Sequence, residues 1–471
     1  MTAVKTKVKT HFTEGPMFLR ILIFTLPIIL TNVIQQLYGT ADQVILGHFS
    51  GNPNAIGAIG STTSMTSLVL NFLLGCSVGA SVTVAQSIGA KDNDQISRAV
   101  HTAITFAAIG GAVITVLGIV VTKPILIALD TKPEMLDDAI LYASIIFLGA
   151  IGSALCNFGA AILRASGDSR TPLIVLTSSG LVNVLLNILF VALLNIGIAG
   201  VAIATVISHY LSAAAILIKL MRAKDATRLN IKRLGIDKQV FRKMMKISIP
   251  SALQTSTFAL SSLFVTGAAN YFSPAEVSGK SISANIENYV SVLISAFYQA
   301  ALTFVGQNYG AGKFNRVKRA ACYVFAWVIM ITVISSTVEI IFAKDIAYLF
   351  IDRTLPDAAA IADAAARRMY IMLPLMFMQG FMTTSTGYLR AIGCSVPPMI
   401  SSIIVNCGFR ILWITLIFPL PGFTTFLGLY SIYPMTWILC SIIQIVLILV
   451  VSKKAFAKKA EELALVKANA N

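Results

Sequence analysis

QSIGAKDNDQISRA at residues 86–99 and QNYGAGKFNRVKRA at residues 307–320 decide how this chain is organised. The second segment repeats five residues of the first at a constant displacement of 221 positions, namely Gln86, Gly89, Ala90, Arg98 and Ala99. Shared hydrophobicity does not produce identities at glutamine, glycine and arginine positions. The chain therefore contains two related halves, and a repeat of this size determines the architecture.

Two further pairs of segments support the repeat. LRASGDSRTP at 163–172 resembles LRAIGCSVPP at 389–398, and SSGLVNVLLNIL at 178–189 resembles SSIIVNCGFRIL at 401–412. Each half also has a proline a few residues into its first apolar run, at Pro27 and Pro250. Both prolines should bend their helices, because proline removes a backbone hydrogen bond and crowds the preceding turn.

The composition places both halves in a membrane. Hydrophobic residues make up 56% of the 471 positions and charged residues 12%, whereas an ordinary soluble chain has about 25% charged residues. A membrane-spanning helix needs about 20 apolar residues, and twelve runs qualify: 17–46, 55–87, 99–122, 138–163, 172–194, 197–218, 247–270, 282–308, 320–342, 369–388, 397–419 and 427–451. The sequence predicts an all-α polytopic membrane protein with twelve transmembrane helices in two six-helix lobes. Since six is even, both lobes enter the membrane from the same side and the repeat is parallel.

The distribution of charge predicts the orientation. If the N-terminus is cytoplasmic, the inner segments contain 28 of the 36 Lys and Arg residues, and Arg410 lies within a span. Basic residues near helix ends stay on the cytoplasmic side, so we expect both termini inside, in a plasma membrane of prokaryotic inner-membrane type. The expected divisions are a tail at 1–15, a first lobe at 16–218, a basic linker at 219–246, a second lobe at 247–451 and a tail at 452–471. The linker should contact anionic lipid rather than nucleic acid.

The repeated turns resemble those of the multidrug and toxic compound extrusion (MATE) family. The resemblance rests on Gln86-Ser-Ile-Gly89-Ala90 with its copy at 307–311, and on Leu-Arg-Ala-x-Gly-x-Ser in both halves. It covers about residues 15–452. It implies a V-shaped pair of lobes, alternating access, and efflux of organic cations or amphipathic compounds in exchange for inward proton or sodium flow. It further implies a monomer that needs no cofactor and is not an enzyme.

Asp42 is the first candidate for ion coupling. Counted from the two prolines it aligns with Val265, so the scaffold does not require a carboxylate there. With Asn32, Gln35 and Gly39 it forms one polar face at helical spacing, which we expect to face protein or water rather than lipid. A carboxylate in a partly dry cavity can bind and release a cation. An alternative is a solvated residue at the outer helix end.

The resemblance adds Asn183, Asn187 and Thr205 to this candidate coupling site. In sequence position these residues are similar to the cation site of the DinF-like branch of the family, and a sodium ion there would be held by Asp42, Asn183, Asn187 and Thr205. That branch often has a second aspartate where this chain has Asn187, so we favour protons over sodium. Hydrogen bonding between helices, without ligand contact, is the alternative for the two asparagines.

Glu287 is the main candidate in the second half. It could attract a cationic substrate or form an ion pair with Arg410. The expected substrate site consists of Glu287 with Asp42, Gln35, Tyr38, Gln254, Tyr289 and Arg410. Gln254 lies near the position where the NorM-like branch has a glutamate, and its neutrality argues against that branch's sodium site. Glu339, close to Lys344, is expected at a solvated helix end.

The sequence also offers two alternatives, a membrane enzyme and a transporter of another substrate. Gly75-Cys-Ser77-Val-Gly79 matches GxSxG and, with His209, could indicate an intramembrane serine hydrolase, but the two glycines suit close helix packing better. A flippase for lipid-linked saccharides should have several basic residues in its cavity, whereas Arg410 is the one basic residue placed within a span. The six cysteines show no metal-binding spacing and no ATP-binding motif is present.

Overall fold

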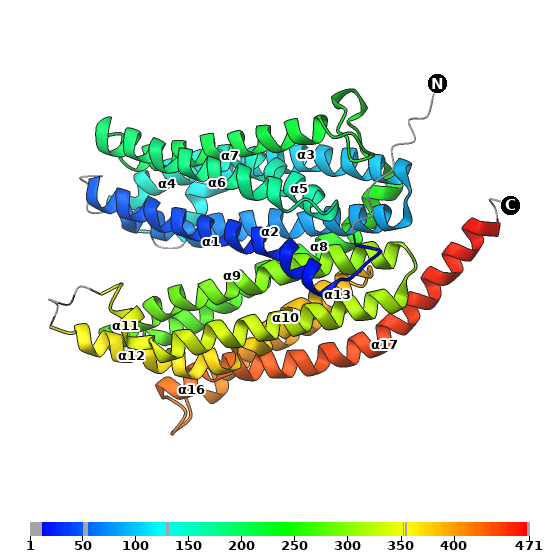
Figure 1. Cartoon of the computed structure of the whole chain (residues 1–471). Coiled ribbons are helices and arrows are strands. Elements are labelled where there is room, and N and C mark those ends of the chain that lie inside the picture. Colours follow the sequence, from blue (N-terminus) through cyan, green and yellow to red (C-terminus); the bar gives the residue numbers. More distant parts are fainter. Residues whose placement is uncertain (1–11, 50–54, 129–130, 352, 354–355, 469–471) are drawn as a thin grey trace. The chain divides into compact units, whose positions relative to one another are not determined.

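A computed structural model describes residues 12–49, 55–128, 131–351, 353 and 356–468, and each regular element in these ranges is a helix (Figure 1). The first half contains α1 (Phe18–Phe49), α2 (Ala55–Ala90), α3 (Asn93–Ala128), α4 (Pro133–Leu148), α5 (Ala150–Ala165), α6 (Arg170–Asn187), η1 (Ile188–Leu193), α7 (Ile198–Met221) and η2 (Ile231–Arg233), and the second half begins with α8 (Lys238–Ala269), which contains Pro250. The second half continues with α9 (Pro274–Gly310), α10 (Phe314–Ile341), α11 (Ala343–Ala347), α12 (Ala358–Met372), η3 (Leu373–Leu375), α13 (Met376–Ala391), α14 (Val396–Ser402), η4 (Ile403–Phe409), α15 (Arg410–Leu412), η5 (Trp413–Ile417), α16 (Phe426–Tyr430) and α17 (Ile432–Ala468).

The predicted spans all fall on helices. Among the described residues, nine helices are long and apolar enough to cross a membrane, and the bent pair α4 and α5, which meet at 43°, adds a tenth. The other two spans are α8 and the continuous series α12, η3 and α13, which are less apolar because of their polar and charged residues. Together they give the predicted twelve-helix fold.

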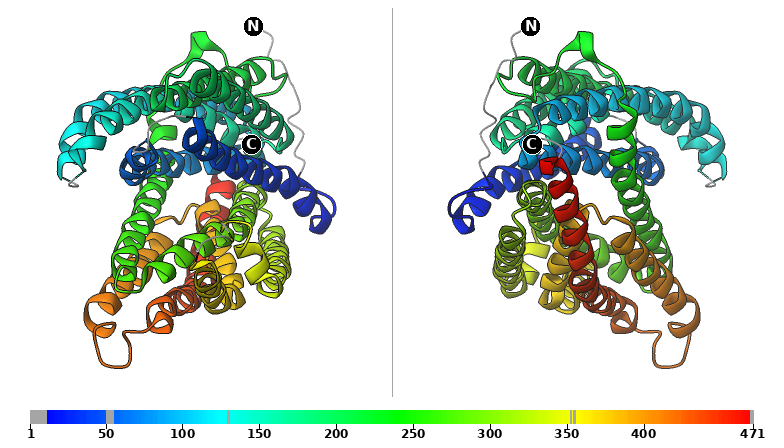
Figure 2. Two further views of the ribbon diagram at one scale, coloured as in Figure 1. Left: turned by 90° about the vertical axis from the view of Figure 1, so that its left-hand side faces the viewer. Right: turned by 90° about the vertical axis from the view of Figure 1, so that its right-hand side faces the viewer.

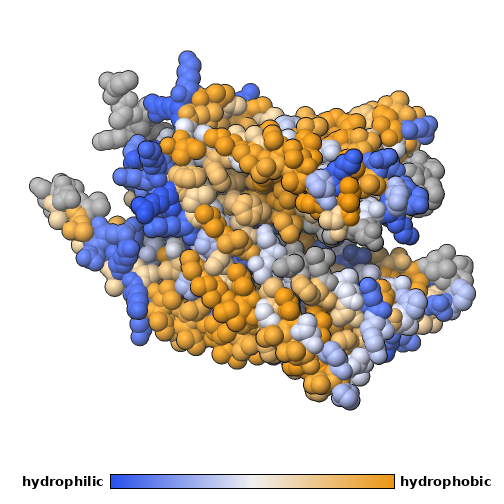
Figure 3. All heavy atoms as spheres, turned by 180° about the vertical axis from the view of Figure 1, so that it is seen from behind, coloured by the Kyte–Doolittle hydropathy of each residue, from blue (hydrophilic) through white to orange (hydrophobic). Residues whose placement is uncertain are grey.

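The surface of each unit fits a lipid environment. Hydrophobic residues cover the sides of the helices, and hydrophilic residues gather at the helix ends (Figure 3). On α3, for example, Val116 is 61% exposed and Val120 67%, and on α17 Leu449 is 63% exposed. Such side chains on a helix surface would be unfavourable in water and are stable against hydrocarbon.

The chain forms two compact units, and the boundary runs through two helices. Unit 1 comprises Met1–Glu14 and Leu26–Ser256, and unit 2 comprises Gly15–Thr25 and Thr257–Asn471. The first turns of α1 pack in unit 2, because the Phe18 ring stacks on Trp327 at 4.6 Å and the indole N–H donates to the Phe18 carbonyl at 2.9 Å. The predicted first lobe placed this segment with the rest of α1.

The repeated turns have the same geometry in both halves. After α5, Gly167 has a φ of +94° and the Asp168 N–H donates to the Leu163 carbonyl at 2.9 Å. After α13, Gly393 has a φ of +85° and the Cys394 N–H donates to the Leu389 carbonyl at 2.8 Å. These are the bonds of a glycine-terminated helix, in which a left-handed residue satisfies the last carbonyls. The Leu-Arg-Ala-x-Gly pattern is thus explained by helix termination.

Gly75 and Gly79 serve helix packing, as the sequence suggested. A Cβ on Gly75 would lie 2.5 Å from the Ala252 Cα, and one on Gly79 would lie 2.5 Å from the Met244 carbonyl oxygen. The two glycines therefore let α2 approach α8 at backbone contact within unit 1.

The basic linker is shorter than predicted and is partly helical. α7 continues to Met221 and α8 begins at Lys238, so the irregular segment covers 222–237 apart from η2. In the end-on views it forms the loop at the top of unit 1 (Figure 2), and its Leu229 packs into the buried core of that unit. At the other end of the chain, α17 extends as a helix past the predicted end of the second lobe at 451.

Candidate functional site

The helices of unit 1 bring together the four residues of the candidate coupling site. Asp42 comes from α1, Asn183 and Asn187 from the end of α6, and Thr205 from α7. The Asn187 Nδ2 donates to the Asp42 Oδ1 at 2.5 Å. When the Asn183 amide is oriented to satisfy its hydrogen bonds, its nitrogen donates to the same oxygen at 2.9 Å and its oxygen accepts the Thr205 N–H at 3.3 Å.

Apolar side chains lie next to this cluster, one helical turn from its polar residues. Ile45, Val191 and Val201 are buried together, and they stand three or four positions from Asp42, Asn187 and Thr205 on the same faces of α1, η1 and α7. Tyr142 of α4 packs against this cluster and is near enough to the Asp42 carboxylate for an electrostatic interaction. The hydrogen-bonded cluster around Asp42 therefore borders a buried apolar cluster.

The hydrogen bonds of the cluster leave one of its acceptors without a donor among the described residues. Amide donors stabilise the ionised form of Asp42, and the neighbouring apolar cluster stabilises the neutral form. Asn187 is fully buried, and its Oδ1 has no hydrogen-bond partner among the described residues. A buried acceptor without a donor is costly, and a proton on the carboxylate or a small cation beside it would remove that cost.

The local helix geometry fits such a site. α6 ends at Asn187, and η1 continues it as a π-helix. A π-helical turn shifts the backbone hydrogen bonds by one residue and occurs often at functional sites.

The other residues predicted in unit 1 are not gathered around Asp42 to the same degree. Tyr38 donates its hydroxyl to the Thr177 carbonyl at 3.0 Å and covers Gly180, so its ring packs α1 against α6. Gln35 is exposed on α1 two turns before Asp42. Gln254 is buried on α8.

In unit 2 the structure corrects the expected partner of Glu287. Its Oε1 accepts a hydrogen bond from the Arg368 NH1 at 2.6 Å, and the side chains are 9% and 5% exposed. The same NH1 donates to the Ser283 hydroxyl at 2.9 Å, and the guanidinium lies 4.9 Å from the centre of the Tyr430 ring. Glu287 is thus engaged by Arg368 and not by Arg410. Tyr289, two positions further on α9, is half-buried on another face.

Arg410 is buried among neutral groups. Its Nε and NH2 donate to the Thr436 hydroxyl at 3.1 and 2.9 Å, and NH2 donates to the Asn406 Oδ1 at 3.4 Å. Its guanidinium lies 4.3 Å from the centre of the Tyr433 ring. A cation over an aromatic face is stabilised by the ring quadrupole. The Tyr433 ring therefore stabilises Arg410 in place of the expected carboxylate.

Glu339 also differs from its prediction. It is 8% exposed on α10, and Lys344, its expected neighbour, pairs instead with Asp363 at 2.6 Å. The residue is therefore a buried carboxyl rather than a solvated helix end.

Sequence reasoning missed Arg368 because the residue lies one position before the predicted span 369–388. Its helix α12 begins ten residues earlier, at Ala358. The alanine-rich stretch 358–366, with its high helix propensity, was the available signal. The premise that Arg410 is the one basic residue within a span is therefore wrong.

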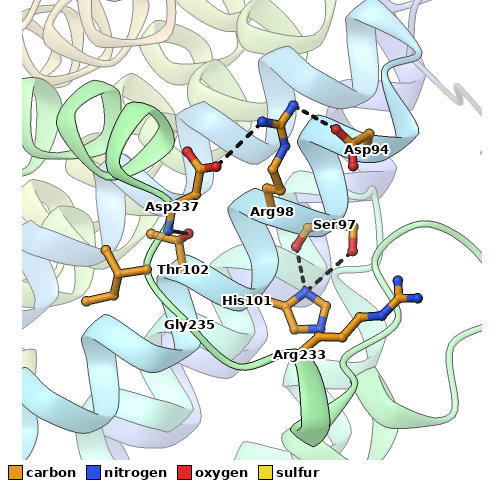
Figure 4. Close-up of a pocket in the computed structure, with 9 residues that line it drawn as sticks. Asp94, Ser97, Arg98, His101, Thr102, Arg233, Gly235 and Asp237 are labelled. Carbon is orange, nitrogen blue, oxygen red and sulfur yellow. Dashed lines mark hydrogen bonds and ion pairs between the residues drawn. The ribbon is translucent and has the colours of Figure 1, made fainter.

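The linker docks on α3 through a polar pocket (Figure 4). His101 donates from Nδ1 to the Ser97 carbonyl at 2.6 Å and accepts the Asn230 N–H on Nε2 at 3.0 Å, which defines the neutral tautomer. Asp237 accepts from Arg98 at 3.5 Å. The backbone N–H of Val240, followed by the charge of Arg98, lowers the pKa of Asp237. This pocket fixes the linker.

The hydrolase hypothesis has no geometric support. Ser77 lies inside α2 and donates to the Leu74 carbonyl at 2.7 Å. A nucleophile elbow needs a strand-to-helix turn, and the described residues contain no strand.

These features define the class of protein. A set of apolar spanning helices that surrounds a hydrogen-bonded carboxylate beside a π-helical turn is typical of a membrane transporter. A family model described as MatE matches residues 27–189 and 250–415, one block in each half. The chain belongs to the MatE family.

Similar proteins agree with this assignment. The probable multidrug resistance protein YoeA of Bacillus subtilis is 26% identical over 63% of this chain and 65% of its own length. The probable multidrug resistance protein NorM of Thermotoga maritima is 24% identical over 80% and 81%, and the multidrug export protein MepA of Staphylococcus aureus is 22% identical over 81% and 83%.

Solved structures show the same fold. A transporter of the MOP superfamily from Pyrococcus furiosus superposes with a TM-score of 0.84 at 20% identity, covering 98% of this chain and 99% of that one. An outward-facing multidrug resistance transporter of the MATE family gives 0.83 at 21% identity over 98% and 99%. The two-lobe MATE fold is therefore the fold of this chain.

Proposed function

We propose that this protein is a secondary active exporter that moves organic cations or amphipathic drugs out of the cell in exchange for inward proton flow, by alternating access. Asp42 is the group that carries the coupling proton. The observation that supports this most directly is the Asn187 Oδ1, which has no partner within the described part of the chain and lies beside a carboxylate held by two amides. The relatives' descriptions as multidrug proteins support the substrate class.

Protons fit this cluster better than sodium. A sodium ion is held by several oxygen ligands, as hard cations are in general. Among the described residues no group of three or more His, Cys, Asp or Glu side chains surrounds a common point, and Asn187 stands where a second carboxylate would add affinity. A single carboxyl that binds and releases one proton needs no further ligands.

Substrate recognition is proposed at the polar face of α1. Gln35 is exposed two turns before Asp42, so a cation there would compete with the proton for the same carboxylate. Glu287 is a weaker candidate for attracting substrate, since Arg368 already neutralises it. The lipid-linked saccharide flippase is not favoured, because the family match and its relatives point to drug efflux and the buried Arg368 is paired.

The test is transport in liposomes containing the purified protein, with pH and sodium gradients imposed separately while a fluorescent cation is followed. Asp42→Asn should insert normally and lose gradient-driven export, and Asp137→Asn, an exposed acid on α4, is the matched control. Export driven by sodium at clamped pH would refute proton coupling. Normal export by Asp42→Asn would refute the role of Asp42.

A further inference from the structure

Unit 2 contains a second buried carboxyl that neither the repeat nor the ion pair explains. Glu339 lies two residues before the end of α10, and Ser336 and Thr332 lie one and two turns earlier on the same face. All three are at most 8% exposed. The Glu339 Oε2, the Ser336 hydroxyl and the Thr332 hydroxyl have no hydrogen-bond partner among the described residues. Buried polar atoms without partners are rare, and three on one helix face call for a physical cause.

This face of α10 points into the unit. A Cβ on Gly380 of α13 would lie 3.3 Å from the Thr332 hydroxyl and 3.5 Å from Ile294 of α9, so Thr332 lies where these helices meet. α9 and α10 run antiparallel across a short turn. Glu287 lies seven residues before Ile294 on α9. Glu339 lies seven residues after Thr332 on α10. The two carboxyls therefore lie at the same level of the α9 and α10 pair.

The charged groups around Glu339 leave it without compensation. From α12, Arg368 is held by Glu287. From α11, Lys344 is exposed and paired with Asp363. Lys280 of α9 lies two turns before Glu287 and is half-exposed. It donates to the Thr266 hydroxyl at 3.0 Å. Arg410 does not face α10 and is stabilised by Tyr433.

An ionised Glu339 would thus be an unpaired buried anion next to a second carboxylate. Such a charge is unfavourable, and the group avoids this by taking up a proton. Protonation also supplies an O–H donor, and the Ser336 hydroxyl one turn away is an available acceptor.

We propose that Glu339 binds an exchangeable proton and forms a second protonation site of the transporter, in unit 2, separate from Asp42. The protonated state itself does not depend on the proposed function; its use in coupling does. With both sites in operation, the exchange would move two protons per cycle where Asp42 alone would move one.

The protonation is tested by infrared difference spectroscopy of the purified full-length protein in liposomes during a pH titration. A protonated carboxyl gives a C=O band that shifts in heavy water. We expect Glu339→Gln to lose one such band, while Asp42→Asn and Asp345→Asn, an exposed acid on α11, retain it. A spectrum unchanged by Glu339→Gln would overturn the proposal.

Two further measurements keep the outcome decisive. If Glu339→Gln does not fold, Glu339→Asp retains a carboxyl but moves it, so the frequency of the band should change, and a spectrum unchanged by Glu339→Asp would also overturn the proposal. For coupling, the proton-to-drug ratio obtained from reversal gradients should fall by one in Glu339→Gln, and an unchanged ratio excludes a coupling role. Failure of Asp42→Asn to affect transport would instead refute the proposed function, so the two failures are distinguishable.

Discussion

Removal of Glu287 is predicted to destabilise unit 2 more than removal of its partner. The pair joins Glu287 and Arg368 at 2.6 Å, with both side chains almost fully buried. Breaking a buried ion pair by removing one partner costs about 3–5 kcal/mol because the other charge remains. Glu287→Leu leaves a guanidinium that cannot lose its proton. Arg368→Met leaves a carboxylate that can gain one, so its effect should be smaller at low pH.

The assay is a double-mutant cycle on apparent melting temperature in detergent. For a unit of this size about 1 kcal/mol corresponds to about 2–4 °C, so Glu287→Leu should lower the midpoint by about 6–20 °C. The double variant Glu287→Leu/Arg368→Met should recover most of the loss, because apolar replacement of a whole pair is often neutral. Additive effects of the two substitutions would refute the reasoning.

Three further predictions concern unit 1. Gly79→Ala should lower stability by about 1–3 kcal/mol because the new methyl group would meet Ser248 and the backbone of α8. Gly60→Ala is the control and should leave stability unchanged, because no atom lies within 4 Å of the new methyl group. A comparison of thermal shifts checks both variants. Lys91 has a φ of +58°, so Lys91→Gly should raise stability by up to about 1 kcal/mol, and a lower melting temperature would contradict this. The pKa of Asp237 is lowered from its ordinary value of 3.8, so its contribution to linker docking is complete above pH 3.8 and is lost as the pH falls through the lowered value. Limited proteolysis between α7 and α8 should therefore accelerate only at strongly acidic pH, and at neutral pH in Asp237→Asn.

The sequence contained most of the fold. Apolar runs located all twelve spans because burial in lipid requires them to be continuous. Helix boundaries in polar segments were harder to predict. α8 begins at Lys238, inside the predicted linker. The sequence did not indicate this start, because a helix with basic residues in its first turns carries no hydropathy signal.

The candidate site was predictable in part. The gathering of Asp42, Asn183, Asn187 and Thr205 was implied by the family resemblance and by the absence of Asp42 from the repeat. The partner of Glu287 was not, since sequence gives a residue's position along its helix but not which neighbouring helix faces it. Arg410 needed no carboxylate because the Tyr433 ring stabilises it, and the burial of Glu339 depends on packing with α9 that no local pattern encodes.

The placement of the first turns of α1 has a consequence for biosynthesis. Gly15 accepts a hydrogen bond from Arg316 at 3.0 Å, and Phe18 contacts Trp327. Those partners lie about 300 residues downstream, and ribosomes add about 5–20 residues per second. Residues 15–25 therefore leave the ribosome roughly 15–60 seconds before the residues that they contact. During that interval Phe18, Leu19 and Ile23, which stay exposed in the finished protein, depend on lipid or the insertion machinery. A chain truncated before α10 would lack the residues that the first turns of α1 contact.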